Sequence, residues 1–532
     1  MSAMSVWVHR VPLVVTLLAT TPALAQGGSL APQARRVHQL LAEWRLAEAE
    51  RALAPLTAIA PDDPAVRLAR GELLFHRGRY KDALAYLEWV TRATKGGAAP
   101  WTRAKYLHTL VRSTAATVEG YSEKRSSGGN FIVRSRGRDR LLADFVGETL
   151  EAARTRLQRD LGFVPPHPVV VEVYPRTTDL ARVSPLTEED IRRSGTIALC
   201  KYQRLMIVSP RALLRGYPWR DTLAHEYTHL VVSSVSHNKV PIWLHEGLAK
   251  HFEARWRLPA SEQAPLTPTQ RQLLAEALAK RSLIPWRKMH PSMAKLPDQR
   301  STALAFAQVQ TAVSFIANKS GIRGLRGLLL AMRAGKTDWQ AVKAVTGLGR
   351  RAFSKGWRRY LRQLGLTRKK GLALHGLVFG RRSSKEKRIA ALKGAKVRRH
   401  FRLADMLRRR GLLRAAVLQY EKARAAGGQR ERIIGNALAR AYLELSMPKR
   451  AISALQPVIE YYPEFAGAQT TLGVAHLALG DVAAAARHLG IALRINPFNP
   501  KIHCGLARAL PKAQAKARAR HGALCKALMS PR

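Results

Sequence analysis

The sequence predicts a mainly helical protein with one α+β domain placed between two regions of repeated helices. Aromatic residues make up only 7% of the 532-residue chain, whereas Ala and Leu are plentiful, a composition that favours helices. An offset of 34 residues recurs near both ends, while the centre holds short β-branched runs followed by a long helical pattern. At roughly 150 residues per domain, this length corresponds to about three domains, or two and a repeat array.

The first residues have the pattern of a secretory signal peptide, which we place at residues 1–25. His9 and Arg10 precede the apolar run VPLVVTLLAT, and two small residues, Ala23 and Ala25, stand at positions −3 and −1 of the expected cleavage site. An N-terminal membrane anchor is the alternative, although the run is short for a hydrocarbon core of about 30 Å. We expect an exported protein, periplasmic or secreted, with no transmembrane span after signal removal.

A repeated pattern at both ends predicts pairs of packed helices. A turn residue, usually small, joins two helices, an Ala five residues later allows their close approach, and a Pro ends the second helix. The residues in this pattern are Trp44, Ala49, Leu53 and Pro61; Gly78, Ala83 and Leu87; Gly411, Ala416 and Tyr420; Ser446, Ala451, Leu455 and Pro463; and Gly480, Ala485, Leu489 and Pro497. The pattern resembles the tetratricopeptide repeat, which implies a surface for partner proteins. We place such repeats at residues 33–127 and, with capping helices, at residues 398–532.

The region between the repeats, residues 128–366, has a different pattern. Its first part holds short apolar or β-branched runs, and from Asp221 almost to Leu364 the pattern is helical. The strand candidates are residues 131–133, 169–174, 196–200 and 205–208, and a helix is expected over residues 141–161. Strands followed by helices are typical of an α+β domain.

The segment HEYTH holds the residues that point to chemistry. On a helix, His225 and His229 lie one turn apart on the same face, where two imidazoles can bind one Zn²⁺. Glu226 is rotated by about 100° from His225, which places its carboxylate beside the metal rather than on it. From there it can take a proton from an attacking water molecule.

A hydrolytic zinc site needs a third protein ligand and an open position. The following segment, PIWLHEGLA, allows a loop over residues 233–240 and a second helix that folds back and presents Glu246 as this ligand. His245 and His251 are competing candidates for the same role. His251 is five residues beyond Glu246 and is expected to face elsewhere on the second helix.

HEYTH followed by PIWLHEGLAKHFE resembles the gluzincin metallopeptidases, and most closely the peptidase MA-like domain. The resemblance covers residues 129–364 and continues through AFAQVQTAVSFIANKSGIRGLRGLLLAM to the segment Trp357–Tyr360. It implies the zinc ligands His225, His229 and Glu246 with Glu226 as general base. It also implies that residues 205–208 form the edge strand beside the site.

The sequence departs from relatives of this family in three places. It lacks the Gly-x-Met-Glu-Asn motif of the aminopeptidase branch, and Lys250 stands where thermolysin-like relatives place an Asp that orients a histidine ligand. Phe306 stands at the position where a tyrosine that stabilises the oxyanion is expected. Candidates for that role are Tyr217, Tyr227 and His290.

Together these observations predict a zinc-dependent metallopeptidase that acts on a peptide or protein substrate recruited by its repeats. The alternative is a repeat scaffold of the cell envelope that carries a catalytically inactive metallopeptidase-like domain. Intact His225, Glu226, His229 and Glu246 favour the enzyme, because the base is often lost first when such a site decays.

Charge and cysteine content bear on partners and compartment. The chain has 90 Lys and Arg against 36 Asp and Glu, a net charge of +54 that implies anionic surroundings such as an envelope polymer. Residues 367–397 form a basic linker, and 368–410 hold 16 basic residues, interpretable as a polymer contact or as a solvated linker. No nucleic-acid motif is present, so specific nucleic-acid binding is not expected. Cys504 and Cys525 could form a disulfide, with Cys200 a buried thiol.

Overall fold

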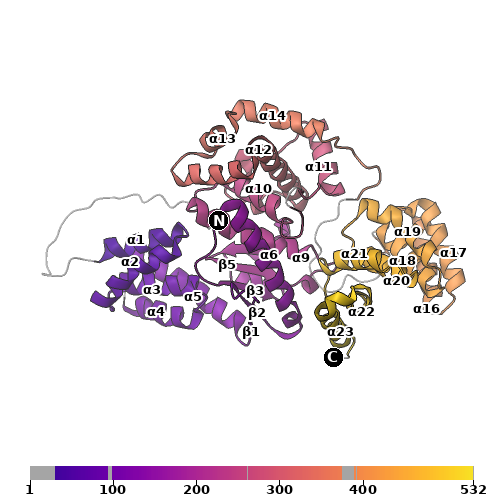
Figure 1. Cartoon of the computed structure of the whole chain (residues 1–532), viewed down its shortest axis with the longest axis horizontal. Coiled ribbons are helices and arrows are strands. Elements are labelled where there is room, and N and C mark those ends of the chain that lie inside the picture. Colours follow the sequence, from indigo (N-terminus) through magenta and orange to yellow (C-terminus); the bar gives the residue numbers. More distant parts are fainter. Residues whose placement is uncertain (1–29, 94–98, 260–261, 374–388, 391, 531–532) are drawn as a thin grey trace. The chain divides into compact units, whose positions relative to one another are not determined.

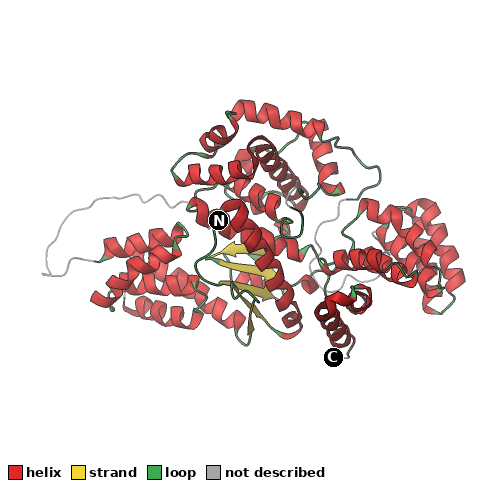
Figure 2. Ribbon diagram, viewed as in Figure 1, coloured by secondary structure: helices red, strands yellow, loops and turns green. Residues whose placement is uncertain are grey.

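The structure is a computed structural model that describes residues 30–93, 99–259, 262–373, 389–390 and 392–530 (Figure 1). The predicted signal peptide and most of the predicted basic linker lie outside the described residues. Most of the described chain is helical, with one small sheet (Figure 2). The predicted fold class is therefore confirmed.

Five helices form the N-terminal region and pack in consecutive pairs. They are α1 (Ala31–Ala42), α2 (Leu46–Ile59), α3 (Pro64–His76), α4 (Tyr80–Ala93) and α5 (Ala99–Val118). The turn residues of the repeat pattern, Trp44 and Gly78, both have positive φ, at 59° and 71°. Ala49 and Ala83 are fully buried where paired helices meet. The repeat pattern therefore marks the turn and the close approach between helices.

A buried carboxylate joins the inner helices of this region. Glu72 of α3 accepts hydrogen bonds from Arg103 of α5 and lies 2.7 Å from Nδ1 of His38 in α1. Burial alone would raise the pKa of Glu72, but the charge of Arg103 and the contact with His38 outweigh it and hold this pKa well below its ordinary value. The three helices are thus linked by one buried charge.

A five-stranded sheet follows, in the order β1-β2-β3-β5-β4. Its strands are β1 (Ser122–Arg125), β2 (Phe131–Ser135), β3 (Val169–Tyr174), β4 (Ala198–Lys201) and β5 (Arg204–Val208). β2 and β3 are parallel, whereas β1 pairs antiparallel with β2 and β4 antiparallel with β5. Helix α6 (Ala143–Leu161) packs against the sheet (Figure 2).

The edge of this sheet differs from the prediction. β5, which holds residues 205–208, lies between β3 and β4, so the expectation that it is the edge strand is wrong. The edge strand on this side of the sheet is β4, which the chain leaves through a reversal at Tyr202 and Gln203, whose φ angles are 54° and 56°. Two-residue hairpin turns of this kind usually contain Asn or Gly, and neither residue here gives that signal.

The helices that follow build the rest of the central domain. They are α7 (Thr177–Arg182), α8 (Glu188–Ser194), α9 (Trp219–Ser236), α10 (Ile242–Phe252), α12 (Gln299–Arg333), α13 (Asp338–Thr346) and α14 (Arg350–Gln363). α10 packs closely against α12, and a Cβ added at Gly247 would lie 2.8 Å from the Val309 carbonyl oxygen. A larger residue at position 247 would therefore push α10 away from its place.

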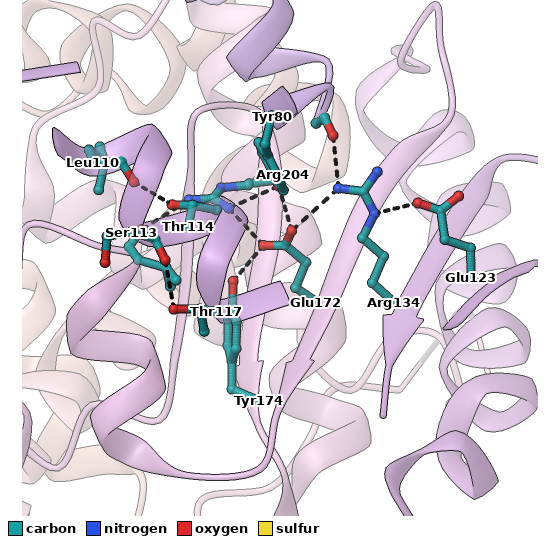
Figure 3. A network of polar contacts seen from close by, with 12 residues as sticks. Tyr80, Leu110, Ser113, Thr114, Thr117, Glu123, Arg134, Glu172, Tyr174 and Arg204 are labelled. Carbon is teal, nitrogen blue, oxygen red and sulfur yellow. Dashed lines mark hydrogen bonds and ion pairs between the residues drawn. The ribbon is translucent and has the colours of Figure 1, made fainter. Parts of the chain in front are cut away.

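A buried polar network connects α4 to the sheet (Figure 3). The guanidinium of Arg204 in β5 lies 2.7 Å from the Glu172 carboxylate of β3 and donates to the Tyr80 hydroxyl at 2.9 Å. Tyr80 and Tyr174 both donate to Glu172, and Arg134 of β2 lies 3.6 Å from the same carboxylate. Arg204 and Glu172 are fully buried. The charge pair thus lies within the sheet, and α4 joins it through the hydroxyl of Tyr80.

The described chain divides into two compact units. The first takes the described residues up to Ile207 together with Leu223–Ala264 and Leu283–Leu364, and the second takes Val208–Thr222, Pro265–Ser282 and the described residues from Gly365 onward. The first unit therefore contains the N-terminal repeats and most of the sheet and site.

The second unit contains the C-terminal repeats. Its helices are α11 (Pro268–Ala279), α16 (Ala395–Arg409), α17 (Leu413–Ala423), α18 (Arg432–Glu444), α19 (Pro448–Tyr461), α20 (Ala466–Ala478), α21 (Val482–Leu493), α22 (Pro500–Ala509) and α23 (Ala515–Met529). The proposed pairing of Cys504 with Cys525 is confirmed as a disulfide that joins α22 to α23. Within this unit, Trp219 donates from its indole to the Leu493 carbonyl at 3.1 Å.

Among the described helices none has the length and apolar character needed to cross a bilayer.

Candidate metal centre and active site

Helix α9 presents the two histidines of the HEYTH segment on one face. The ring centroids of His225 and His229 are 4.7 Å apart, as expected for residues one turn apart. Leu223, Leu230 and Val231 are buried around them, so the helix is held by apolar contacts on its other faces. This packing fixes the direction of both imidazoles.

Helix α10 folds back and brings a carboxylate to both imidazoles. Two residues with positive φ, His237 and Asn238, reverse the chain between the helices. Glu246 Oε2 then lies 3.2 Å from Nε2 of His225 and 3.4 Å from Nε2 of His229. The structure thus brings together the three residues that were predicted as metal ligands.

The spacing of these atoms fits a zinc ion. Zinc takes nitrogen and oxygen ligands at about 2.0–2.2 Å in a tetrahedral arrangement, which places neighbouring ligand atoms about 3.3–3.5 Å apart. Glu226 also offers an oxygen within 4.8 Å of ligand atoms of His225 and His229. Glu246 fits the position of a third ligand better than Glu226, because its oxygen lies close to Nε2 of both histidines and Glu226 has a backbone partner in Cys200.

The second nitrogen of His225 has a partner that the sequence analysis missed. Nδ1 of His225 lies 3.2 Å from Glu253 Oε2, and the other oxygen of Glu253 contacts Nζ of Lys250 at 2.5 Å. Glu253 is seven residues beyond Glu246, about 20° from the same helical direction, so it follows Glu246 on one face. The available signal in the sequence was a carboxylate seven residues after Glu246, two turns further along the same helix face, rather than four residues after it.

His245, a rival candidate for the third ligand, contacts the imidazole of His229 instead. Its Nδ1 lies 2.5 Å from Nδ1 of His229, the two rings stack, and its Nε2 lies 3.0 Å from the Ser233 hydroxyl. If His229 binds a metal through Nε2, its Nδ1 carries the proton and donates to His245. His251, the other rival, is buried, and burial lowers its pKa to about 4.

Burial and neighbouring charges determine the protonation of the site. Burial would lower the pKa of His225, but hydrogen bonds to Glu246 and Glu253 outweigh it and raise this pKa to about 10. Burial would raise the pKa of Glu246, but the two imidazoles hold it well below its ordinary value. Burial raises the pKa of Glu226, offset only in part by the same imidazoles. The carboxylates of Glu246 and Glu253 thus place negative charge around His225, and the carboxylate of raised proton affinity, Glu226, lies beside them.

The edge strand β4 lies beside Glu226. Lys201 and Arg204 flank the two-residue turn, so they form the hydrogen-bonded pair and leave the backbone of Cys200 directed away from β5. The Glu226 carboxylate accordingly has a backbone hydrogen bond with Cys200. Burial raises the pKa of the Cys200 thiol well above its ordinary value. An edge strand with outward backbone groups thus borders the predicted base.

The contacts of the three candidates for oxyanion stabilisation lie elsewhere than at the two histidines and Glu246. Tyr217 is buried and donates its hydroxyl to the Val208 carbonyl, and the ring of Tyr227 packs against Phe131. His290 is exposed. Phe306 packs edge-on against His225 at 6.2 Å between ring centroids. Among the described residues, none of these candidates therefore has a contact that identifies it as the donor to an oxyanion.

Comparisons with known proteins agree with this organisation. The Peptidase MA superfamily model matches residues 149–363, and tetratricopeptide repeat models match residues 40–104, 436–500 and 470–528. No curated protein matches the chain.

Several solved structures show weak likeness. MamA is 18% identical, with 27% of this chain and 82% of MamA covered at a TM-score of 0.22. Yeast Tom70 is 12% identical, with 93% and 84% covered at a TM-score of 0.22. The chain thus carries a Peptidase MA superfamily domain flanked at both ends by tetratricopeptide repeats, as its sequence resemblance predicted.

Proposed function

We propose that the protein is a zinc-dependent peptidase whose site is formed by α9 and α10. The observation that carries the proposal is the convergence of Nε2 of His225, Nε2 of His229 and Oε2 of Glu246, with Glu226 beside them. Zinc held there supplies a Lewis acid that polarises a carbonyl group and activates water near neutral pH.

Glu226 is the residue that moves protons in this proposal. Its buried carboxylate takes a proton from the attacking water and passes it to the leaving amine. The raised pKa of Glu226 suits both steps, because the carboxylate must hold the proton between them. Glu253 and His245 keep the two imidazoles oriented.

The substrate is a peptide in extended conformation. The outward backbone groups of β4 can pair with a peptide main chain, as an added strand does at a sheet edge. The tetratricopeptide repeats recruit a substrate or partner protein through their helical surfaces. Export to a periplasm or secretion accords with the Cys504–Cys525 disulfide, since disulfides persist in oxidising compartments.

Peptide-library cleavage by the full chain tests this function, with Glu246→Gln compared with Glu262→Gln. Glu262 is an exposed carboxylate, so its variant makes the same chemical change away from the ligands. We expect chelator-sensitive cleavage that added zinc restores, retained in Glu262→Gln and lost together with bound zinc in Glu246→Gln. Cleavage unaffected by chelator and by Glu246→Gln would refute a zinc site built on this residue.

A second function is favoured by the surroundings of the oxyanion candidates. Tyr217 donates its hydroxyl to Val208, the ring of Tyr227 packs against Phe131 with the charges of Arg154 and Glu151 as neighbours, and Phe306 offers no hydrogen bond beside His225. A scaffold that binds zinc without turnover would have this arrangement. Bound zinc with no cleavage of any peptide in the library would favour the scaffold.

A further inference from the structure

We propose that helix α14 is a binding site for a linear polyanion that carries phosphate groups along its chain. The site is a groove of about 550 Å³ lined by residues of this helix. The lining residues are Arg350, Arg351, Ser354, Lys355, Arg358, Arg359 and Arg362.

The cationic surface of α14 is rigidly supported. Phe353, Trp357 and Leu361 are buried on the opposite side of the helix, and Trp357 donates from its indole to Thr311 of α12 at 3.2 Å. The ring of Phe315 in α12 packs against Phe353. The apolar residues are therefore used inside the domain, and the exposed surface holds the charges.

The six cations that line the groove lack nearby carboxylates. All six are exposed, and among the described residues none of them forms an ion pair. The sequence explains this, because Asp338 is the single acidic residue between Asp298 and Glu386. Like charges held this close repel one another, so a bound polyanion would relieve that repulsion.

The chemistry of the groove favours phosphate groups. Five of the six cations are Arg, whose planar fork binds phosphate oxygens with two parallel hydrogen bonds. Residues 350 and 362 are separated by about 18 Å along the helix, so a chain with several phosphates can contact the cations in succession. Ser354 also lies in the row, but its hydroxyl donates to the Arg350 carbonyl at 2.9 Å, so the six cations provide the donors for a ligand.

The same residues argue against two other anionic partners. The residues that line the groove include no aromatic side chain, and the neighbouring ring of Trp339 already has the Arg350 guanidinium over it at 5.5 Å. Single-stranded nucleic acid is usually held by stacking of successive bases on free aromatic rings. None of the described residues of α14 is an exposed large hydrophobic residue, which a membrane surface would use as an anchor. A plain phosphate polymer therefore fits the groove best.

Binding of end-labelled linear inorganic polyphosphate to the full chain tests the proposal. The groove variant is Arg351→Gln, Lys355→Gln and Arg359→Gln. The matched control replaces three exposed cations of α16, at positions 396, 399 and 402, with Gln, which removes the same charge at the C-terminal end of the predicted basic linker and just beyond it. All six positions are exposed, so unchanged denaturation midpoints check that both variants are folded.

We expect the groove variant to bind polyphosphate at least tenfold more weakly near 0.1 M salt, with the slope of log K against log salt reduced by about 2. The α16 variant should change affinity by less than about twofold. Equal losses in both variants would overturn the proposal in favour of bulk charge. It would also be overturned if the groove variant kept its polyphosphate affinity and lost binding to anionic vesicles or to single-stranded DNA instead.

Discussion

The buried pair of Arg204 and Glu172, which Tyr80 of α4 contacts, offers a demanding test of the polar network inside the sheet (Figure 3). Replacement of Glu172 by Gln keeps the side chain's shape but leaves Arg204 fully buried without a countercharge. Arg204 cannot shed its proton in a protein, so the cost is not relieved by titration. Loss of one partner of a buried ion pair typically costs about 3–5 kcal/mol.

The double variant separates this pair from the other contacts. Arg204→Met in the Glu172→Gln background removes the uncompensated charge. The Gln oxygen can still accept from one of the hydroxyls of Tyr80 and Tyr174, and its amide nitrogen can donate to the other. We expect the free energy of unfolding of the double variant to be at least about 2 kcal/mol higher than the summed losses of the two single variants predict. Urea denaturation of the full chain, followed by tryptophan fluorescence, measures the free energy of unfolding of Glu172→Gln, of Arg204→Met and of the double variant.

Additivity within about 0.5 kcal/mol would refute the reasoning, because independent sites add to that accuracy. A single loss below about 1 kcal/mol for Glu172→Gln would also contradict it, since exposed pairs contribute no more than that. Either result would mean that the two side chains do not compensate each other inside the protein.

Three further predictions concern separate parts of the molecule. Glu253→Ala should weaken zinc binding by about 10–100-fold, because His225 loses its orienting carboxylate, and competition with a chelator of known affinity measures this. Reduction of the Cys504–Cys525 disulfide should lower the stability of the second unit by about 3 kcal/mol, measured by denaturation with and without reductant. The pKa of Glu72 is lowered in the folded protein, so Glu72 stabilises the fold above its unfolded pKa of about 4.3, and this stabilisation is lost as the pH falls below that value. In Glu72→Gln the unfolding midpoint should therefore decline less steeply at acid pH. An unchanged decline would contradict this prediction.

Much of the site could be predicted from the sequence because its signals are local. His225 and His229 are one helical turn apart, and the return of a second helix bearing Glu246 follows from a short loop between two apolar segments. The repeat turns were also local, since Trp44 and Gly78 take the same backbone conformation at equivalent positions. Periodicity of this kind is preserved whatever the tertiary packing.

Other features depend on contacts that spacing does not encode. The order of β4 and β5 in the sheet was wrong in the prediction, because a Tyr-Gln turn gives no standard hairpin signal. Glu253 follows the end of α10, and its role depends on a partner 28 residues away. Tyr80 belongs to a repeat helix, and nothing in its own segment indicates that it donates to Glu172 of the sheet.

The most direct test of the central claim combines metal content and peptide turnover in one pair of proteins. The chain from Gln26 onward would be compared with its Glu226→Gln variant. The account predicts about one zinc per chain in both, with chelator-sensitive cleavage in the wild type and no cleavage in the variant. No zinc in either protein would contradict the ligand set of His225, His229 and Glu246, and full activity in the variant would contradict the role of Glu226.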